Sequence, residues 1–459
     1  MMKGAKANVV EVIGNTPIIR LNKVAAHVKS DIYVKMEFLN PGGSMKDRVA
    51  LNIIHDAERR GLLQPGGTIV EATSGNTGAG LALIGTVRGY KSIFVMPDKM
   101  SHEKIATLRA FGAKVVICPT AVEPSDPRSY YEVTKRIVAE TPGAFHANQY
   151  HNPANPEAHY VSTAPEIWNE TGGELDVFVA GMGTGGTISG CGRYFKEKKP
   201  GFQIVGVDPI GSLYYDYVKT GRLTKPFSYA VEGIGEDFLP STMNLKIIDE
   251  IIRVDDKECF LMTRRLVREE GIFCGGSCGA AVAGAIRYAE KLGDVKKNIL
   301  VLLPDSAQKY LSKIFDDKWM AENGFLEEPD LLGQVADLLR ARPKRSIVST
   351  AKGETVGGTI SLFKEHGISQ LPVFEEGRMV GLVSETDLLN FLVKNPGSLS
   401  TPIDDLVEAD YATVTPETKV KLLRTVFNDA KLVCVIDRDD VVGVITKIDL
   451  IEYLAQRHA

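Results

Sequence analysis

The sequence predicts an α/β protein built on mostly parallel sheets, followed by a smaller repeated unit. Between residues 31 and 305, short apolar runs rich in β-branched residues alternate with amphipathic stretches. This alternation is typical of parallel strands joined by helices that cover both faces of a sheet. Glycine-rich loops follow several of the apolar runs. Because ligands of parallel sheets bind beyond the C-terminal ends of the strands, these loops are the expected place for a site.

The individual elements follow from these runs. A helix is predicted directly after Lys46, where Val49, Ile53 and Ala57 recur at helical spacing. Further helices are predicted at 101–112 and from about 280 to 293. Buried strands are predicted at 31–38, 68–72, 92–97, 114–119, 176–183, 203–209 and 298–304.

Composition excludes several classes of protein. A net charge of -4 argues against a nucleic-acid-binding surface or a basic membrane-binding face. No apolar run approaches the roughly 18–20 residues that a membrane span needs. The 6 cysteines form neither a dense disulfide framework nor paired metal-binding motifs, and the histidines show no metal-ligand spacing. We therefore expect a cytoplasmic protein with no structural metal, no nucleic-acid partner and no membrane partner.

The C-terminal region contains an internal repeat. Residues 371–393 and 433–455 align without a gap at an offset of 62. The alignment pairs Ser384 with Thr446 and Asp387 with Asp449. A repeated strand–turn–strand–helix unit predicts modules that bury their faces against each other. We place the first domain at 1–325, a connector at 326–345, and the repeats at about 346–398 and 403–457 within 346–459.

Four loops of the first domain carry candidate chemistry: the loop before Lys46, "TSGNTG" (73–78), "GTGGT" (183–187) and "GGS" (275–277). Glycines and threonines at a helix N-terminus offer free N–H groups and favour a phosphate, although many such loops are only packing turns. A lysine is ordinarily a solvated surface residue. Together with a phosphate cradle, it predicts a Schiff base with a phosphorylated carbonyl cofactor, pyridoxal 5′-phosphate.

Taken together, these motifs resemble a known family. "GNTP" (14–17), "NPGGSMKDR" (40–48) and the other three loops occur in the order of the fold-type II pyridoxal-phosphate enzymes, which are tryptophan synthase β-like. Residues 148–160, 231–240 and 303–320 resemble the cystathionine β-synthase family within them, and the tail resembles a tandem CBS (Bateman) module. The resemblance spans about residues 8–455.

The resemblance implies roles for individual residues. Lys46 would form the Schiff base and act as the catalytic base. The cofactor would be held by Asn76, Gly183, Thr184, Gly185, Gly186, Thr187 and Ser277, and the amino-acid substrate by Thr73, Ser74, Thr77, Gln149, Tyr150, Gly233 and Gly235. A neutral serine beside the ring nitrogen would stabilise a carbanion less than a carboxylate does, which favours β-elimination over transamination. The alternative for Ser277 is a plain helix N-cap.

In the tail, Ser384, Asp387, Thr446 and Asp449 would bind an adenosyl effector, with S-adenosylmethionine as the first candidate. A carboxylate can accept hydrogen bonds from the two ribose hydroxyls. The alternative is that the repeats only dimerise. Two departures from animal members stand out: no haem is expected, since no cysteine or histidine precedes residue 14, and Glu236 replaces their usual tyrosine.

The resemblance implies a β-replacement that joins L-serine and L-homocysteine to L-cystathionine and water, within transsulfuration and cysteine biosynthesis. Release of hydrogen sulfide belongs to the same chemistry. The first alternative is a cysteine synthase that uses O-acetylserine and sulfide. An alternative of another class is an inactive adenosyl-ligand sensor on an enzyme scaffold. We expect only small-molecule substrates as partners, and a homodimer or homotetramer.

Overall fold

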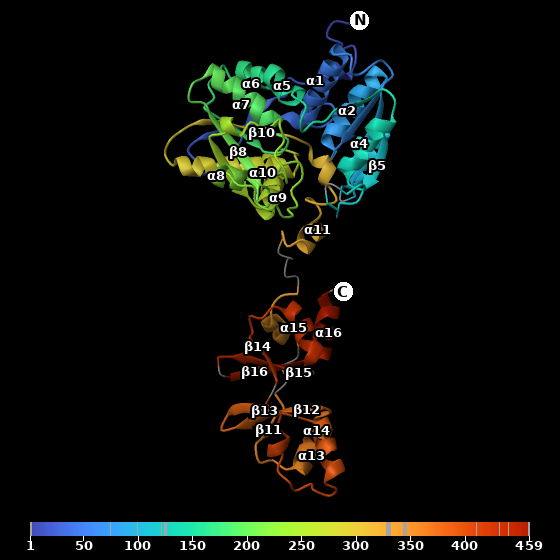
Figure 1. The fold of residues 1–459 in the computed structure, drawn as a ribbon. Coiled ribbons are helices and arrows are strands. Elements are labelled where there is room, and N and C mark those ends of the chain that lie inside the picture. The colour runs from blue at the N-terminus through green and yellow to red at the C-terminus, as the bar shows by residue number, and fades with distance from the viewer. Residues whose placement is uncertain are drawn as a thin grey trace. The chain divides into compact units, whose positions relative to one another are not determined.

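The structure is a computed structural model that describes residues 2–73, 75–98, 100–120, 122–123, 126–326, 332–342, 347–409, 411–430, 432–438 and 440–457. The chain divides into two compact units, Met1–Leu326 and Glu327–Ala459. Each unit has its own sheets and its own hydrophobic core (Figure 1). The two units are therefore described separately.

The larger sheet of the first unit has six strands in the order β1-β2-β10-β7-β8-β9. Only β1 is antiparallel; the other neighbours are parallel. The strands are β1 Ile18–Arg20, β2 Asp31–Met36, β7 Val177–Gly181, β8 Gln203–Pro209, β9 Glu250–Val254 and β10 Asn298–Leu303. The predicted strands at 31–38, 176–183, 203–209 and 298–304 are thus confirmed.

Helices cover both faces of this sheet because its central strands are apolar on both sides. In β7, Val177 and Val179 belong to the core beneath α9 (Asp256–Glu270) and α10 (Gly276–Leu292). The intervening Phe178 and Ala180 belong to the core of the opposite face. That face is covered by α6 (Ala164–Glu170), α7 (Gly186–Lys198) and α8 (Tyr214–Thr220).

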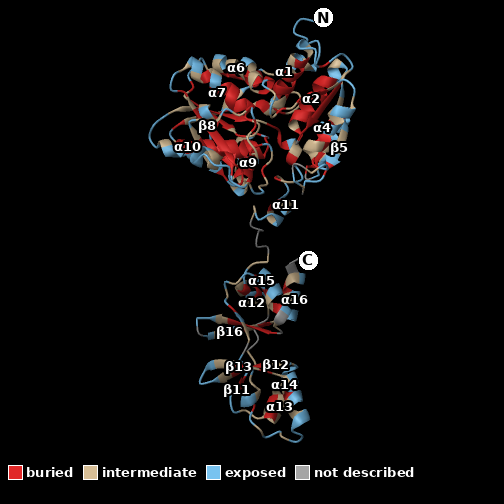
Figure 2. Ribbon diagram, in the orientation of Figure 1, coloured by how far each residue is buried: buried red, intermediate tan, exposed pale blue. Residues whose placement is uncertain are grey.

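The smaller sheet has the parallel order β5-β4-β3-β6. Its strands are β3 Thr68–Ala72, β4 Lys91–Pro97, β5 Lys114–Cys118 and β6 Ala144–His146. Its core is red in the burial view of Figure 2, under α1 and α2. The helices of this part are α1 Lys46–Arg59, α2 Asn76–Arg88, α3 His102–Ala110, α4 Tyr130–Glu140 and α5 Ala154–Ala158. The helix α11 (Asp317–Glu322) closes the unit.

The second unit contains two three-stranded sheets with the same topology. The strands are β11 Thr350–Ala351, β12 Gln370–Glu375, β13 Arg378–Ser384, β14 Ala412–Val414, β15 Leu432–Asp437 and β16 Asp440–Thr446. The helices are α12 Val335–Ala341, α13 Val356–His366, α14 Glu385–Lys394, α15 Val420–Asp429 and α16 Lys447–Arg457. Val373 pairs with Gly381 and Val435 with Gly443, so the strand register repeats at the offset read from the sequence.

Two local features differ in detail from the sequence expectations. The helix expected from about residue 280 begins at Gly276, because the small residues of "GGSCGA" pack closely beside Thr263 and Phe260. Part of the expected connector is helical: Val335 and Leu338 of α12 are buried in the core of the second repeat. Among the described residues, no helix is both long and apolar enough to cross a membrane.

Candidate active site

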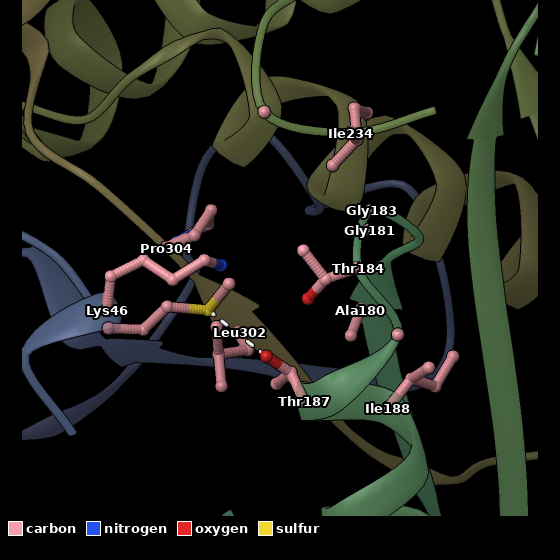
Figure 3. Close-up of a pocket in the computed structure, with 13 residues that line it drawn as sticks. Lys46, Ala180, Gly181, Gly183, Thr184, Thr187, Ile188, Ile234, Leu302 and Pro304 are labelled. Carbon is pink, nitrogen blue, oxygen red and sulfur yellow. Dashed lines mark hydrogen bonds between the residues drawn. The ribbon is translucent and has the colours of Figure 1, made fainter. Parts of the chain in front are cut away.

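A cavity lies in the first unit where strands of the large sheet end. Lys46 points its nitrogen into this cavity (Figure 3). The lining comes from the start of α1, the end of β7 with the β7–α7 loop, the loop after α8 and the end of β10. The lining residues are Met45, Lys46, Ala180, Gly181, Gly183, Thr184, Gly185, Thr187, Ile188, Gly233, Ile234, Leu302 and Pro304. The structure thus brings the Lys46 loop and the "GTGGT" loop together.

Lys46 is placed there as the first residue of α1. Burial lowers the pKa of its amine to about 8, although the nearby Asp305 opposes that change. The Lys46 main-chain N–H donates to Ser44 Oγ at 3.3 Å, but its side-chain Nζ has no hydrogen-bond or ion-pair partner among the described residues. With a pKa of about 8, an unpaired, desolvated lysine is a free base for about a tenth of the time at pH 7 and about half of the time at pH 8, far more often than an exposed lysine.

The "GTGGT" loop forms the start of α7 and leaves its N–H groups open. Gly185 is the N-cap, with φ 84° and no side-chain cap. A Cβ at Gly185 would lie 2.5 Å from the Met243 main chain, so only glycine fits. The Thr184 hydroxyl accepts from Asn155 Nδ2 at 3.0 Å. The loop therefore offers hydroxyls and main-chain donors at the positive end of a helix, which suits a phosphate.

Ser277 lies near the start of α10, but it is not the N-cap, which is Gly275. The buried Ser277 hydroxyl has no hydrogen-bond partner among the described residues. A Cβ built on Gly233 would meet only this hydroxyl, at 4.0 Å. The helix-capping alternative is therefore wrong. The open space between Gly233 and the unpaired Ser277 hydroxyl is also suitable for the edge of a flat cofactor ring.

The "TSGNTG" loop leads into α2 and contains four of the predicted residues: Thr73, Ser74, Asn76 and Thr77. Thr73 Oγ1 accepts from the Gly75 main chain at 3.0 Å, which shapes the loop. Thr77 Oγ1 donates to Gln149 Oε1 at 2.5 Å, and this leaves the Gln149 N–H₂ group as a donor. Ser74 lies outside the described residues.

The carboxyl of Glu71, near the end of β3, holds the main chain at Gln149. The Glu71 carboxyl accepts from the Gln149 main chain at 3.1 Å and from Asn148 at 2.6 Å. Burial raises the pKa of Glu71 to about 8. The Tyr150 ring packs edge-on against Phe238 with 5.1 Å between centroids. Substrate contacts by these residues stay predictions.

The loop containing Gly233 and Gly235 closes over the cavity, as Ile234 lines it. The Gly235 main chain donates to Met182 O at 2.6 Å. Glu236 follows; burial and the neighbouring Asp237 raise the pKa of its carboxyl well above the usual range, while Lys46 opposes this. Glu236 therefore lies within electrostatic range of Lys46.

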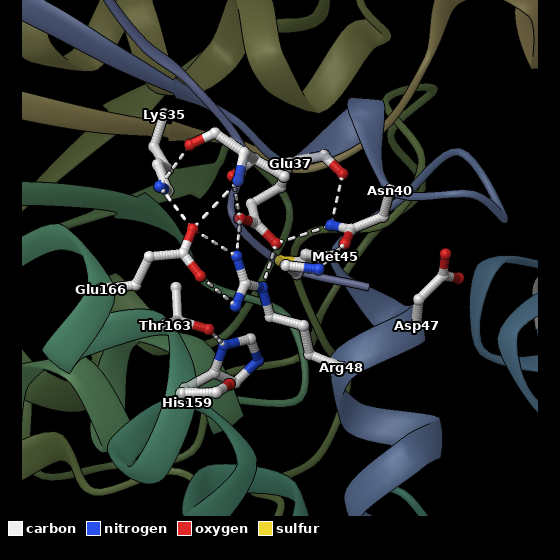
Figure 4. A network of polar contacts seen from close by, with 12 residues as sticks. Lys35, Glu37, Asn40, Met45, Asp47, Arg48, His159, Thr163 and Glu166 are labelled. Atoms are coloured by element: carbon white, nitrogen blue, oxygen red, sulfur yellow. Dashed lines mark hydrogen bonds and ion pairs between the residues drawn. The ribbon is translucent and has the colours of Figure 1, made fainter. Parts of the chain in front are cut away.

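A buried ionic network holds the first turn of α1 (Figure 4). Arg48 pairs with Glu37 and with Glu166, each at 2.8 Å, and Lys35 pairs with Glu166 at 2.6 Å. His159 contacts Thr187 Oγ1 at 3.1 Å, and burial lowers the pKa of this histidine well below 6.5. Arg48 lies two residues after Lys46, so the network fixes the start of α1. A neutral His159 joins the same region to the "GTGGT" loop.

Sequence reasoning assigned no role to several residues that support the site. Tyr214 donates to Gly183 O at 2.7 Å and Asn155 donates to Thr184. Asp305 and Lys309 both contact Asn76. Only Asp305 had a usable signal, because it comes directly after a strand that ends at the site. Tyr214, Asn155 and Lys309 lie in short helices, and their partners at the site are distant in the sequence.

The four tail residues form two equivalent helix starts. Ser384 Oγ accepts from the Asp387 main chain, and Asp387 Oδ2 accepts from the Ser384 main chain at 2.8 Å. Asp449 Oδ2 accepts from the Thr446 main chain at 2.7 Å, and its second oxygen lies 3.7 Å from Arg342. These contacts stabilise the helix N-termini. Effector binding by the same residues stays a prediction.

Comparison with known proteins gives the context of this site. The family model described as pyridoxal-phosphate dependent enzyme matches residues 9–305. The CBS domain model matches residues 335–394 and 403–456. The geometry fits the cofactor named in the first description: an amine and an open helix N-terminus line one cavity, and the unpaired Ser277 hydroxyl lies beside Gly233, which also lines it.

Individual relatives agree. A cystathionine beta-synthase of Dictyostelium discoideum is 37% identical over 97% of this chain and 92% of its own length. A cysteine synthase of Staphylococcus aureus is 42% identical over 68% of this chain and 98% of its own length. The crystal structure of a hydrogen sulfide-producing enzyme from Fusobacterium nucleatum covers 67% of this chain and 100% of its own, with 37% identity and a TM-score of 0.63.

Proposed function

Because the chain belongs to the cystathionine β-synthase family and is a pyridoxal-phosphate-dependent lyase, we propose that it condenses L-serine with L-homocysteine to L-cystathionine and water. The observation that carries the proposal is the desolvated Lys46 amine in one cavity with the glycine-rich cradle. The similarity to cystathionine beta-synthases extends through the tail, whereas the similarity to the cysteine synthase covers 68% of this chain.

The cofactor, when bound, supplies the electron sink that makes the α-proton of serine acidic. Thr184, Thr187 and the N–H groups that begin α7 would hold its phosphate, and Ser277 would face its ring nitrogen. Lys46 Nζ is the group that takes the α-proton, since its lowered pKa of about 8 makes it available as a free base. The same Nζ then delivers a proton to the departing hydroxyl of serine.

Substrate orientation would come from the "TSGNTG" loop and Gln149. With Gln149 Oε1 held by Thr77, the amide nitrogen is left to donate to a carboxylate. Main-chain N–H groups at the start of α2 would be further donors, because Gly75 begins this helix without a side-chain cap; of these groups, the Gly78 N–H donates to Thr73 Oγ1 at 3.3 Å. Amino-acid carboxylates are suitable anions for such donors.

The substrate test uses purified protein with serine or O-acetylserine, each offered with homocysteine or sulfide. We expect the highest kcat/KM for serine with homocysteine, with cystathionine identified by mass spectrometry. A higher kcat/KM for O-acetylserine with sulfide would favour the cysteine synthase alternative, which the 42% identity to the Staphylococcus aureus enzyme supports. Sulfide release from cysteine is measured in the same assay.

We also propose that the tail binds an adenosyl compound, with S-adenosylmethionine as the first candidate. The support is the pair of equivalent aspartates, Asp387 and Asp449, and the match to two CBS domains. Calorimetry with S-adenosylmethionine, AMP and ATP separates the candidates. Asp449→Ala should weaken binding more than Asp387→Ala, since Arg342 also lies beside Asp449. No heat with any of the three compounds would contradict the proposal.

We further propose a homodimer or homotetramer in the cytoplasm, with no nucleic-acid or membrane partner. All six cysteines are buried and unpaired, which suits a reducing compartment. The helices α14 and α16 expose apolar side chains at equivalent positions, Leu389 and Ile451. Light scattering at micromolar concentration should give at least a dimer, and a monomer would contradict this assembly.

A further inference from the structure

The Asn76 amide lies between two groups of opposite charge that come from one short segment. Asn76 Nδ2 donates to Asp305 Oδ2 at 2.8 Å. Lys309 Nζ donates to Asn76 Oδ1 at 2.6 Å. An ammonium has only donors and an ionised carboxylate only acceptors, so the two ends of the amide are not interchangeable. The amide can adopt only one of its two flipped orientations here.

Both partners of Asn76 are themselves held firmly. Tyr310 donates its hydroxyl to Asp305 Oδ2 at 2.6 Å, and Asp305 is 1% exposed. A Cβ on Gly275 would lie 2.2 Å from Asp305 Oδ1, so this glycine leaves the room that the carboxylate occupies. Lys309 Nζ also donates to Gly43 O at 3.3 Å. The two charged groups therefore keep fixed positions around the amide.

We propose that Asp305, together with Lys309, is a positioning residue that fixes the Asn76 amide for cofactor binding. With one N–H of Nδ2 given to Asp305 and Oδ1 given to Lys309, one N–H remains. That donor is the part of Asn76 that can meet an anionic oxygen of the cofactor ring. A flipped amide would present its carbonyl oxygen instead, which repels an anion. The inference rests on the cofactor assignment but not on the identity of the substrates.

The main chain around Asp305 has a separate role, which side-chain substitution leaves intact. Met45 donates to Pro304 O at 2.9 Å and Ser306 donates to Gly43 O at 3.2 Å. The Gly275 main chain donates to Asp305 O at 3.0 Å. These bonds join the loops of Lys46 and Ser277. Changing the Asp305 side chain therefore tests the orientation of Asn76 rather than the path of these loops.

The experiment compares Asp305→Ala, Asp305→Asn and Lys309→Met by the visible circular dichroism of the bound cofactor and by its dissociation constant, without any amino acid. Visible dichroism reports how the cofactor is held, which a loss of global stability alone does not alter. We expect Asp305→Ala to weaken cofactor binding by roughly tenfold and to change the dichroism, as the loss of one charge-assisted hydrogen bond implies. Asp305→Asn should recover most of both, since an amide oxygen can still accept from Asn76. Lys309→Met should change the dichroism as Asp305→Ala does.

Asp208 provides a matched control, because it is another buried aspartate, 0% exposed, that accepts from the Tyr215 main chain at 2.9 Å. Asp208→Ala should lower thermal stability and leave the dichroism unchanged. In an Asn76→Ala background, Asp305→Ala should add no further change in dichroism. A change in dichroism in the double variant as large as that of Asp305→Ala alone would overturn the inference. Wild-type dichroism and cofactor affinity in both Asp305→Ala and Lys309→Met would also overturn it. Cofactor binding that responds as expected, without cystathionine formation, would overturn the substrate proposal alone.

Discussion

The helices that begin at the candidate site differ from α3, α4, α9 and α11 of the same unit in how they begin. The helices α1, α2, α7 and α10 follow Met45, Gly75, Gly185 and Gly275, none of which makes a side-chain cap hydrogen bond to a described residue. Elsewhere in the same unit, α3, α4, α9 and α11 begin on Ser101, Ser129, Asp255 and Asp316, whose side chains all accept from the first turn. The four loops of the candidate site therefore all lead into helices without such a cap, although α5, α6 and α8 also begin without one.

In the second unit, α13, α14 and α16 follow the capped pattern, whereas α15 has no side-chain cap among the described residues. Thr355 caps α13, and Ser384 with Asp387 forms a reciprocal capping box on α14. Thr446 and Asp449 make equivalent contacts at the start of α16. A helix whose first N–H groups are satisfied by its own side chains has no need of an anion, whereas an uncapped one keeps donors for a ligand. An effector at the tail would have to share these aspartates with the caps.

The largest effect is expected where an open helix start carries the reacting amine. Lys46→Ala should lower turnover by at least about 10³-fold, because no other described side chain brings an amine into the cavity. Steady-state cystathionine formation measures this. The exposed Lys91→Ala is the control and should keep wild-type turnover. Substantial residual turnover in Lys46→Ala would remove this lysine from the mechanism.

A smaller effect is expected from closing the start of α7. Gly185→Ala should weaken cofactor binding by about 2 kcal/mol, roughly 30-fold, since a Cβ would lie 2.5 Å from Met243. Fluorescence titration with the cofactor measures the change. Gly112→Ala is the matched control: φ is +81° at Gly112, close to the +84° of Gly185, but a Cβ on Gly112 would meet nothing within 4 Å. It should cost stability and leave affinity intact. Equal affinity losses in both variants would show that backbone strain, not the closed cradle, is responsible.

The buried Lys46 amine should also lower the free energy of unfolding when the cofactor is absent. Burial lowers its pKa from 10.5 to about 8, and because the side chain is only partly buried the penalty is on the order of 2 kcal/mol. The unfolded chain holds the proton more tightly, so the penalty is complete below pH about 8 and disappears toward 10.5. In urea unfolding, the free energy of unfolding of Lys46→Met should exceed that of the wild type, and the difference should be largest near neutral pH. A stability difference that stays constant across this pH range would argue against a depressed pKa.

The smallest effects are expected at the capped helices of the tail. Ser384→Ala and Thr446→Ala should each cost about 1 kcal/mol of unfolding free energy in the second unit. Cofactor affinity of the first unit should not change. Differential scanning calorimetry measures the former and titration the latter. A loss of cofactor affinity in either variant would mean that the comparison between open and capped helix starts does not separate the two units.

Much of the architecture could be read from local patterns. The strands β3, β7, β8 and β10 are continuous apolar runs, and such runs form buried parallel strands because both of their faces are covered. The repeat offset also predicted that β12 and β15 are equivalent strands of the two repeats. Boundaries were less predictable: α10 starts at Gly276, because tight packing on Thr263 and Phe260 permits helix where glycines alone suggest a loop.

By itself, the sequence determined which loops meet at the strand ends and which residue types they bring, since chain direction and hydrophobic periodicity are local properties. Only the tertiary structure decided the properties that depend on neighbours distant in the chain. Asp305 lies 229 positions from the Asn76 amide that it contacts, and no local pattern encodes that contact. The lowered pKa of Lys46 likewise arises from desolvation, which exists only once the β7–α7 loop, the loop after α8 and the end of β10 surround the amine.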